Sequence, residues 1–170
     1  MKTNVNGNKG VVKAFCIILL FIGLQRTQAQ EKTRLPNFRI ALTDSSYFNG
    51  EKLKKGKAVL FIYFLPDCED CRDFISALIP RMRSFKNKQI VMITNAPLNQ
   101  VVKIEKEFKL RSFKNLIVGT EGRTGDFQRS FSIERFPFAA AYNKNGRLIQ
   151  EFNNQITNQV MIRQLINLCK

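Results

Sequence analysis

The amino-acid sequence predicts an α/β protein in which a mixed central β-sheet is flanked by helices. Short apolar runs alternate with amphipathic helical patterns through the first two thirds of the chain. Nearer the C-terminus, an Asn-Gly step separates two strand-like runs, which favours an antiparallel hairpin. Strands joined through helices, followed by a hairpin and a last helix, require a sheet of mixed direction.

The first part of the chain predicts a strand, a link, a second strand and a helix. A short strand is expected at 37–42, and a polar, turn-rich link at 43–57. The run 59–64 is apolar throughout and rich in aromatic and branched residues, which is typical of a strand covered on both faces. Pro66 ends it. Apolar residues then return at helical spacing, at Phe74, Ile75, Leu78, Ile79 and Met82.

The rest of the chain continues the alternation. Further strands are expected at short apolar runs, namely 90–93, 116–118, 139–142 and 147–152. Further helices are expected where apolar residues share one helical face, around 101–108, 127–131 and 160–168. The turn at 143–146 contains the Asn-Gly step and joins the last two strands.

The first 29 residues have the three parts of a secretory signal peptide. Lysines precede an apolar run at 14–24, and Thr27-Gln28-Ala29 provides small residues for cleavage. The run is shorter than the roughly 20 residues that a membrane-spanning helix needs. We therefore expect a signal peptide at 1–29, a single domain at 30–170, and export to the periplasm or cell envelope of a bacterium.

The composition narrows the possible functions. The formal net charge is +15, and the cations lack the aromatic spacing of nucleic-acid-binding modules, so no nucleic-acid partner is expected. Solvated faces account for most of these charges. The alternative is attraction to acidic proteins or to an anionic envelope surface. The chain has no His, which excludes His-based acid–base catalysis and Cys/His zinc sites, and no metal site is expected.

Two cysteines form the strongest chemical signal. Cys68-Glu69-Asp70-Cys71 directly follows a buried strand and opens a helix. The positive end of the helix dipole and its free N–H groups favour a thiolate there, so Cys68 is the predicted attacking thiol. Cys71, within the first turn, is placed to displace a mixed disulfide. The alternative is a disulfide or buried pair without turnover, and Cys169 is expected to serve packing.

These residues and the order of elements resemble the thioredoxin superfamily, in particular exported thiol-disulfide reductases of the TlpA and ResA type, over about 37–168. The resemblance implies a thioredoxin-like three-layer fold and a redox-active Cys68–Cys71 disulfide with no other cofactor. It also implies a cis-proline at Pro137, with Phe136 offering main-chain hydrogen bonds to an extended substrate segment. The implied partners are protein disulfides or dithiols and an upstream electron donor.

Some residues depart from the family pattern. Asp67 stands where these proteins commonly have a Trp before the first Cys, and it is expected to line the substrate-binding site with Phe136 and Pro137. Ile62 occupies the position of a buried acid in thioredoxin itself, so proton transfer must use Glu69, Asp70, another acid or water. The helix proline comes late, at Pro80, which predicts a kink further from the cysteines.

The acids around Cys68 have a predicted electrostatic effect. Asp67, Glu69 and Asp70 place negative charge near its sulfur and disfavour the thiolate, although Arg72 can offset one charge. The helix dipole acts in the opposite direction. We therefore expect these acids to lower the reduction potential of the Cys68–Cys71 pair, which makes it a reducing couple.

Two other functions remain open. A peroxidase related to alkyl hydroperoxide reductase shares the implied fold, but the segment 65–68 lacks the Thr that such enzymes place near the reactive Cys. A binding module is the second possibility, in which the cysteines hold a soft metal such as Cu(I) or brace a peptide groove.

Overall fold

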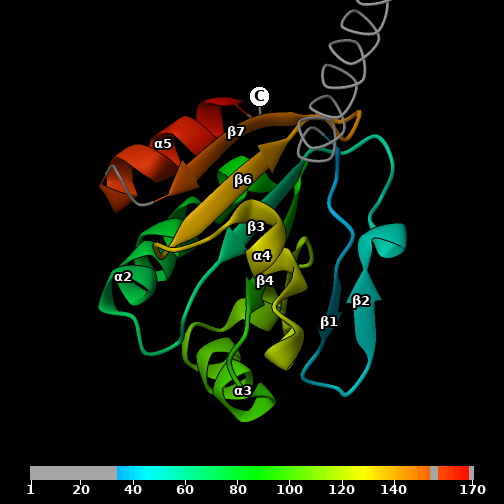
Figure 1. The fold of residues 1–170 in the computed structure, drawn as a ribbon. Coiled ribbons are helices and arrows are strands. Elements are labelled where there is room, and N and C mark those ends of the chain that lie inside the picture. The colour runs from blue at the N-terminus through cyan, green and yellow to red at the C-terminus, as the bar shows by residue number, and fades with distance from the viewer. Residues whose placement is uncertain (1–33, 154–156, 169–170) are drawn as a thin grey trace, which may run out of the picture. The chain divides into compact units, whose positions relative to one another are not determined.

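The computed structural model describes residues 34–153 and 157–168 (Figure 1). The predicted signal peptide at 1–29 and Cys169 lie outside these residues. In the described part, a seven-stranded sheet has the order β2-β1-β5-β4-β3-β6-β7. The strands are β1 (Arg39–Ala41), β2 (Tyr47–Asn49), β3 (Val59–Tyr63), β4 (Gln89–Thr94), β5 (Leu116–Thr120), β6 (Phe138–Tyr142) and β7 (Leu148–Asn153).

Longer and shorter helices connect these strands. The α-helices are α2 (Glu69–Leu78), α3 (Leu98–Glu107), α4 (Asp126–Phe131) and α5 (Asn158–Leu168). The 3₁₀ helices are η1 (Gly50–Lys52), η2 (Ile79–Phe85), η3 (Leu110–Ser112) and η4 (Gly122–Thr124). Within 34–153 and 157–168, every helix is too short or too polar to cross a membrane.

The sheet is mixed in direction. Strands β3, β4 and β5 are parallel to one another. Strand β6 is antiparallel to β3, β7 is antiparallel to β6, and β1 is antiparallel to β2 and β5. The predicted α/β fold with a mixed central sheet is therefore confirmed.

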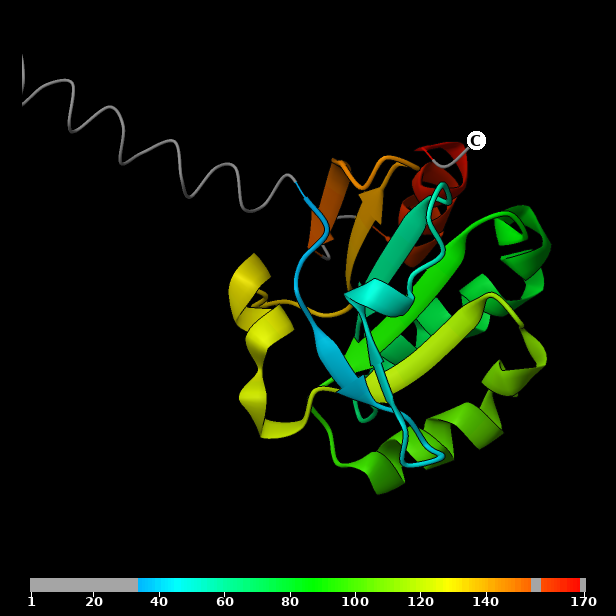
Figure 2. The ribbon, with the colours of Figure 1, turned by 90° about the vertical axis from the view of Figure 1, so that its right-hand side faces the viewer.

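Helices lie on both faces of the sheet. Helices α2, α3 and α5 pack on one face through a core cluster that includes Phe74, Val101 and Leu165. Helix α4 packs on the other face through Phe127 and Phe131. Figure 2 shows α4 (yellow) and α5 (red) on opposite sides of the sheet. This arrangement gives the three layers that the sequence predicts.

Strand β3 contributes to both cores. Its five residues are all buried. Because successive side chains of a strand point to opposite faces, Leu60 and Ile62 join the cluster under α2, while Phe61 and Tyr63 join the cluster under α4. The loop after β3 therefore starts from a strand that is fixed on both faces.

Two local expectations need correction. The predicted link at 43–57 contains β2 and η1. Strand β2 has three residues and only Phe48 is buried, which is too short a pattern to show alternation. The predicted helix after the cysteines changes character just before Pro80, because α2 ends at Leu78 and η2 begins at Ile79. Proline has no N–H to donate to the α-helical ladder, so the change of helix type falls there.

Candidate active site

The loop after β3 places Cys68 at the start of α2. The Phe64 N–H donates to the Ile93 carbonyl of β4 at 3.0 Å, which ties the beginning of the loop to the sheet. The Cys68 N–H donates to the Leu65 carbonyl at 3.2 Å and closes a turn around the buried Pro66. Cys68 is then the N-cap residue of α2.

The sulfur of Cys68 caps the helix. The Cys71 N–H donates to the Cys68 Sγ at 3.3 Å, so the sulfur fills a role that Ser, Asp or Asn oxygens usually have. The hydrogen bond and the positive end of the helix both act on this atom. Cys68 is partly exposed, and both cysteines are free thiols. Cys68 is therefore the more accessible thiol of the pair.

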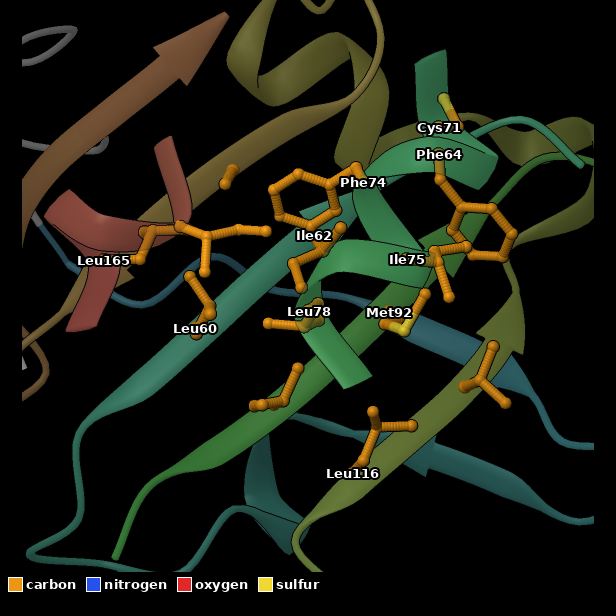
Figure 3. Close-up of a cluster of buried hydrophobic side chains, with 14 of the residues drawn as sticks. Leu60, Ile62, Phe64, Cys71, Phe74, Ile75, Leu78, Met92, Leu116 and Leu165 are labelled. Carbon is orange, nitrogen blue, oxygen red and sulfur yellow. The ribbon is translucent and has the colours of Figure 1, made fainter. Parts of the chain in front are cut away.

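Cys71 differs sharply from Cys68 in its surroundings. Its side chain is 0% exposed and belongs to the core cluster under α2, where Figure 3 shows it at one end. Burial raises the pKa of the Cys71 thiol well above its usual value, and the contact with Cys68 and the charge of Asp70 add to the shift. A raised thiol pKa keeps the proton on sulfur over a wider pH range, so Cys71 is the less reactive thiol in the reduced protein.

Iodoacetamide is expected to alkylate Cys68 well before Cys71, because the thiolate is the reactive species and Cys71 is buried and protonated. Brief labelling at pH 7 and pH 9, followed by peptide mass spectrometry, measures both sites separately. In a Cys68→Ser control, Cys71 should remain slow because its burial is unchanged. Equal labelling of the two cysteines at pH 7 would contradict this assignment.

The acids around Cys68 lie at the surface. Asp67, Glu69 and Asp70 are all exposed, so solvent and salt screen their charges. Arg72 does not act as the sequence suggested. Its guanidinium forms an ion pair with Glu107 at the end of α3 and lies over the Phe108 ring. Arg72, which was expected to offset one of the charges near Cys68, is therefore paired with an acid of α3 instead.

The predicted substrate-binding turn lies at the same end of the sheet as the cysteines. The Phe136–Pro137 bond is cis, and the chain then enters β6, whose Phe138 pairs with Tyr63 at the end of β3. The Phe136 ring lies 6.0 Å from the Tyr63 ring, measured between centroids. Phe136 and Cys68 both pack against the core cluster that contains Cys71. Cys68 and Cys71 are thus brought to one edge with Phe136 and Pro137.

Beneath the cysteines the sheet is apolar. Ile62 is fully buried in the cluster shown in Figure 3, among Leu60, Phe74 and Ile75. The position at which the resemblance to thioredoxin implies a buried acid therefore holds a hydrocarbon side chain, and Cys71 receives no proton acceptor from this position of β3.

A buried acid on the other face of the sheet was not predicted. Glu121 accepts hydrogen bonds from the Tyr63 hydroxyl (2.7 Å), the Phe127 N–H (2.7 Å) and the Gln128 N–H (3.3 Å). Burial, together with the bond to Glu121, raises the pKa of Tyr63, so its hydroxyl stays protonated and donates. Tyr63 and Cys71 belong to different core clusters. Glu121 therefore fixes α4 to β3 and does not contact the thiols.

A second unpredicted contact supports the helix of the cysteines. The Asn158 Nδ2 of α5 donates to the Asp70 carbonyl in the first turn of α2 at 2.9 Å. The two residues are 88 positions apart in the chain. The sequence around Asn158 does not predict this hydrogen bond, because the bond depends on how α5 packs beside α2.

Comparisons with known proteins place the fold. No protein-family model matches the sequence, and a sequence search against curated proteins finds no match. The thioredoxin domain of a Bacteroides vulgatus thiol-disulfide oxidoreductase superposes with a TM-score of 0.66 at 17% identity, covering 82% of this chain and 98% of that domain. A secreted Mycobacterium tuberculosis disulfide oxidoreductase, homologous to Escherichia coli DsbE, superposes with a TM-score of 0.64 at 16% identity, covering 77% of this chain and 95% of that one.

A third similar structure has copper bound. Arabidopsis thaliana ScoI with copper bound superposes with a TM-score of 0.59 at 14% identity, covering 77% of this chain and 94% of that one. At such low identities the comparisons establish architecture. The chain has the thioredoxin-like fold found in bacterial thiol-disulfide oxidoreductases.

Proposed function

We propose that the protein is an exported thiol-disulfide oxidoreductase that reduces disulfides of bacterial envelope proteins. The observation that carries the proposal is the pairing of an accessible Cys68 sulfur, at the N-cap of α2, with a buried Cys71 thiol three residues later. The similarity to the secreted Mycobacterium tuberculosis disulfide oxidoreductase of the same fold supports it.

The two thiols divide the reaction into two exchanges. The Cys68 thiolate attacks one sulfur of a substrate disulfide, the substrate S–S bond breaks, and the leaving substrate thiolate takes up a proton. Cys71 then gives its proton to water or to a nearby acid such as Asp70, and attacks the Cys68 sulfur. The substrate leaves with both sulfurs reduced, and the protein holds a Cys68–Cys71 disulfide. A dithiol donor upstream must supply two electrons to restore the pair.

The position of the turn before β6 suggests how a substrate is held. Phe136 and Pro137 stand at the cysteine end of the sheet, opposite the end of β3. An extended substrate segment bound along the Phe136 main chain would bring its disulfide to Cys68. Asp67 is exposed beside Cys68 and replaces an aromatic cover with a charged side chain. We infer that this change favours substrates with cationic residues near the disulfide.

The reduction potential of the Cys68–Cys71 pair is expected near that of thioredoxin, about −270 mV. The reason is that the negative charges of Glu69 and Asp70 disfavour a Cys68 thiolate. The reduced form is then stabilised less than it is in a strong oxidant, which makes the pair a better reductant. Equilibration in glutathione buffers, together with insulin reduction, measures the potential and the turnover. Glu69→Gln with Asp70→Asn should move the potential towards oxidising values, whereas Asp73→Asn, one turn further along α2, should change it little.

The outcomes of this experiment separate the possible functions. A potential close to about −120 mV, typical of a strong oxidant, would contradict the reducing direction. A pair that never cycles would contradict redox turnover and favour the binding-module alternative. The peroxidase and soft-metal alternatives from the sequence predict, respectively, peroxide consumption and a metal that copurifies with the protein.

A further inference from the structure

The loops at the end of the sheet away from the cysteines are joined into one surface. The Lys54 N–H donates to the Gln89 Oε1 at 2.6 Å, and the Gln89 Nε2 donates back to the Lys54 carbonyl at 3.0 Å. The Asn115 Nδ2 donates to the Phe85 carbonyl at 2.9 Å and to the Lys88 carbonyl at 3.1 Å. Two side-chain amides thus hold together the segments that lead into β3, β4 and β5.

The hairpin turn of β6 and β7 lies at the same end. Val59, the first residue of β3, pairs with Tyr142, the last residue of β6. The turn at 143–147 therefore follows beside the loop that precedes β3, as Figure 1 shows. Four segments, far apart in sequence, meet at this end of the sheet.

These segments carry positive charge without negative charge. The sequence contains no Asp or Glu over 52–66, 74–104, 108–120 and 135–150. We define the basic edge by six exposed lysines of these segments at this end, which are Lys54, Lys55, Lys57, Lys86, Lys114 and Lys144. In the described part of the chain, none of these six forms an ion pair. Their positive charge is therefore presented to solvent.

The opposite end of the sheet carries exposed acids around the cysteines. Asp67, Glu69, Asp70 and Asp73 lie on the cysteine loop and the start of α2, and all four are exposed. The six lysines of the basic edge and the four acids around the cysteines therefore lie at opposite ends of β3, β4 and β5.

We propose that the basic edge docks on an anionic phospholipid surface and turns the cysteine edge away from it. A protein interface usually has an apolar centre, but the large apolar side chains exposed in residues 34–153 and 157–168, namely Tyr47, Ile149 and Val160, belong to three different elements. Flexible lysines of a single sign, spread over four loops, match a diffuse layer of lipid phosphates. The acids around Cys68 are repelled by the same layer, so both ends favour one orientation.

The test compares two variants of the full chain that lose the same net charge. One carries Lys55→Gln, Lys86→Gln and Lys114→Gln on the basic edge. The other carries Lys103→Gln, Arg123→Gln and Arg163→Gln, which replace exposed cations on α3, η4 and α5. Binding is measured by cosedimentation with vesicles of phosphatidylcholine alone and with phosphatidylglycerol added. Because the N-terminal apolar run is common to all the proteins, the ratio of the two partition coefficients isolates the charge effect.

The basic-edge variant is expected to lose about a hundredfold in this ratio, since each cation near an anionic surface contributes a factor of about five. The control should lose less than about tenfold, because its cations lie on elements outside the basic edge and the attraction to the surface falls off within a Debye length. Insulin reduction in solution should be unchanged by the basic-edge variant, and carboxymethylation of Cys68 should continue at its usual rate on vesicles. Equal losses in both variants, no preference for anionic vesicles, or protection of Cys68 would each overturn the proposal; absence of vesicle binding would favour an acidic protein partner instead.

Discussion

Replacing Cys68 by Ser is expected to lower insulin reduction by a factor of about 10³ or more, as removal of a nucleophile does in other enzymes. A serine hydroxyl is not ionised at neutral pH and forms no disulfide, so neither exchange can take place. The fold should tolerate the change. Serine is a favoured N-cap residue, and its oxygen can accept the Cys71 N–H in place of the sulfur. The melting temperature, measured beside the activity, separates lost chemistry from lost structure.

A Cys71→Ser variant is the matched control for the order of the two thiols. It keeps the accessible Cys68 sulfur and removes only the resolving step, so it should accumulate a mixed disulfide with its substrate. Non-reducing electrophoresis detects the adduct, and dithiothreitol should release it. Turnover that survives in Cys68→Ser would contradict the assignment of Cys68 as the nucleophile. A mixed disulfide that forms through Cys71 would contradict it as well.

The central strands could be predicted because their burial leaves a strong pattern in the sequence. Strands β3 and β4 are covered on both faces, so nearly every position must be apolar. The hairpin of β6 and β7 was predicted from its turn residues. Strand β2 could not be predicted, since its pairing with β1 depends on the backbone and on a single buried residue, Phe48.

The candidate site shows the same division between local and tertiary information. The placement of Cys68 at a helix start follows from a strand that ends just before an amphipathic pattern. The partner of Arg72 could not be derived, because Glu107 is 35 residues away and reaches it only through the packing of α3. The bond between Tyr63 and Glu121 spans 58 residues for the same reason. Local patterns thus predict where the thiols lie, and tertiary packing decides which charges surround them.

Replacing Phe127 by Ala is expected to lower the free energy of unfolding by about 3–5 kcal/mol, the usual cost of removing a fully buried aromatic ring. Its ring is 0% exposed. The ring centroids of Phe131, Phe61 and Tyr63 lie 4.7, 5.1 and 6.0 Å from it. Removal of the ring would leave a cavity among these neighbours. It would also weaken the packing of α4 on the sheet, because Phe131 would be the only large buried side chain left in this six-residue helix. Urea unfolding measures the change.

The same substitution tests whether stability and redox chemistry are separable in this fold. Phe127 lies in the core cluster on the α4 face, whereas Cys71 lies in the cluster under α2. The alkylation rate of Cys68 should therefore change less than twofold in the folded variant, because β3 stands between the two clusters and keeps its pairing with β4. Ile149→Ala, at a half-exposed position of β7, should cost no more than about 0.5 kcal/mol and serves as the surface control. A loss of unfolding free energy below about 1 kcal/mol for Phe127→Ala would mean that the neighbouring side chains close the cavity. A large rise in the alkylation rate of Cys68 would mean that α4 helps to position the cysteine loop through Tyr63 and Phe136.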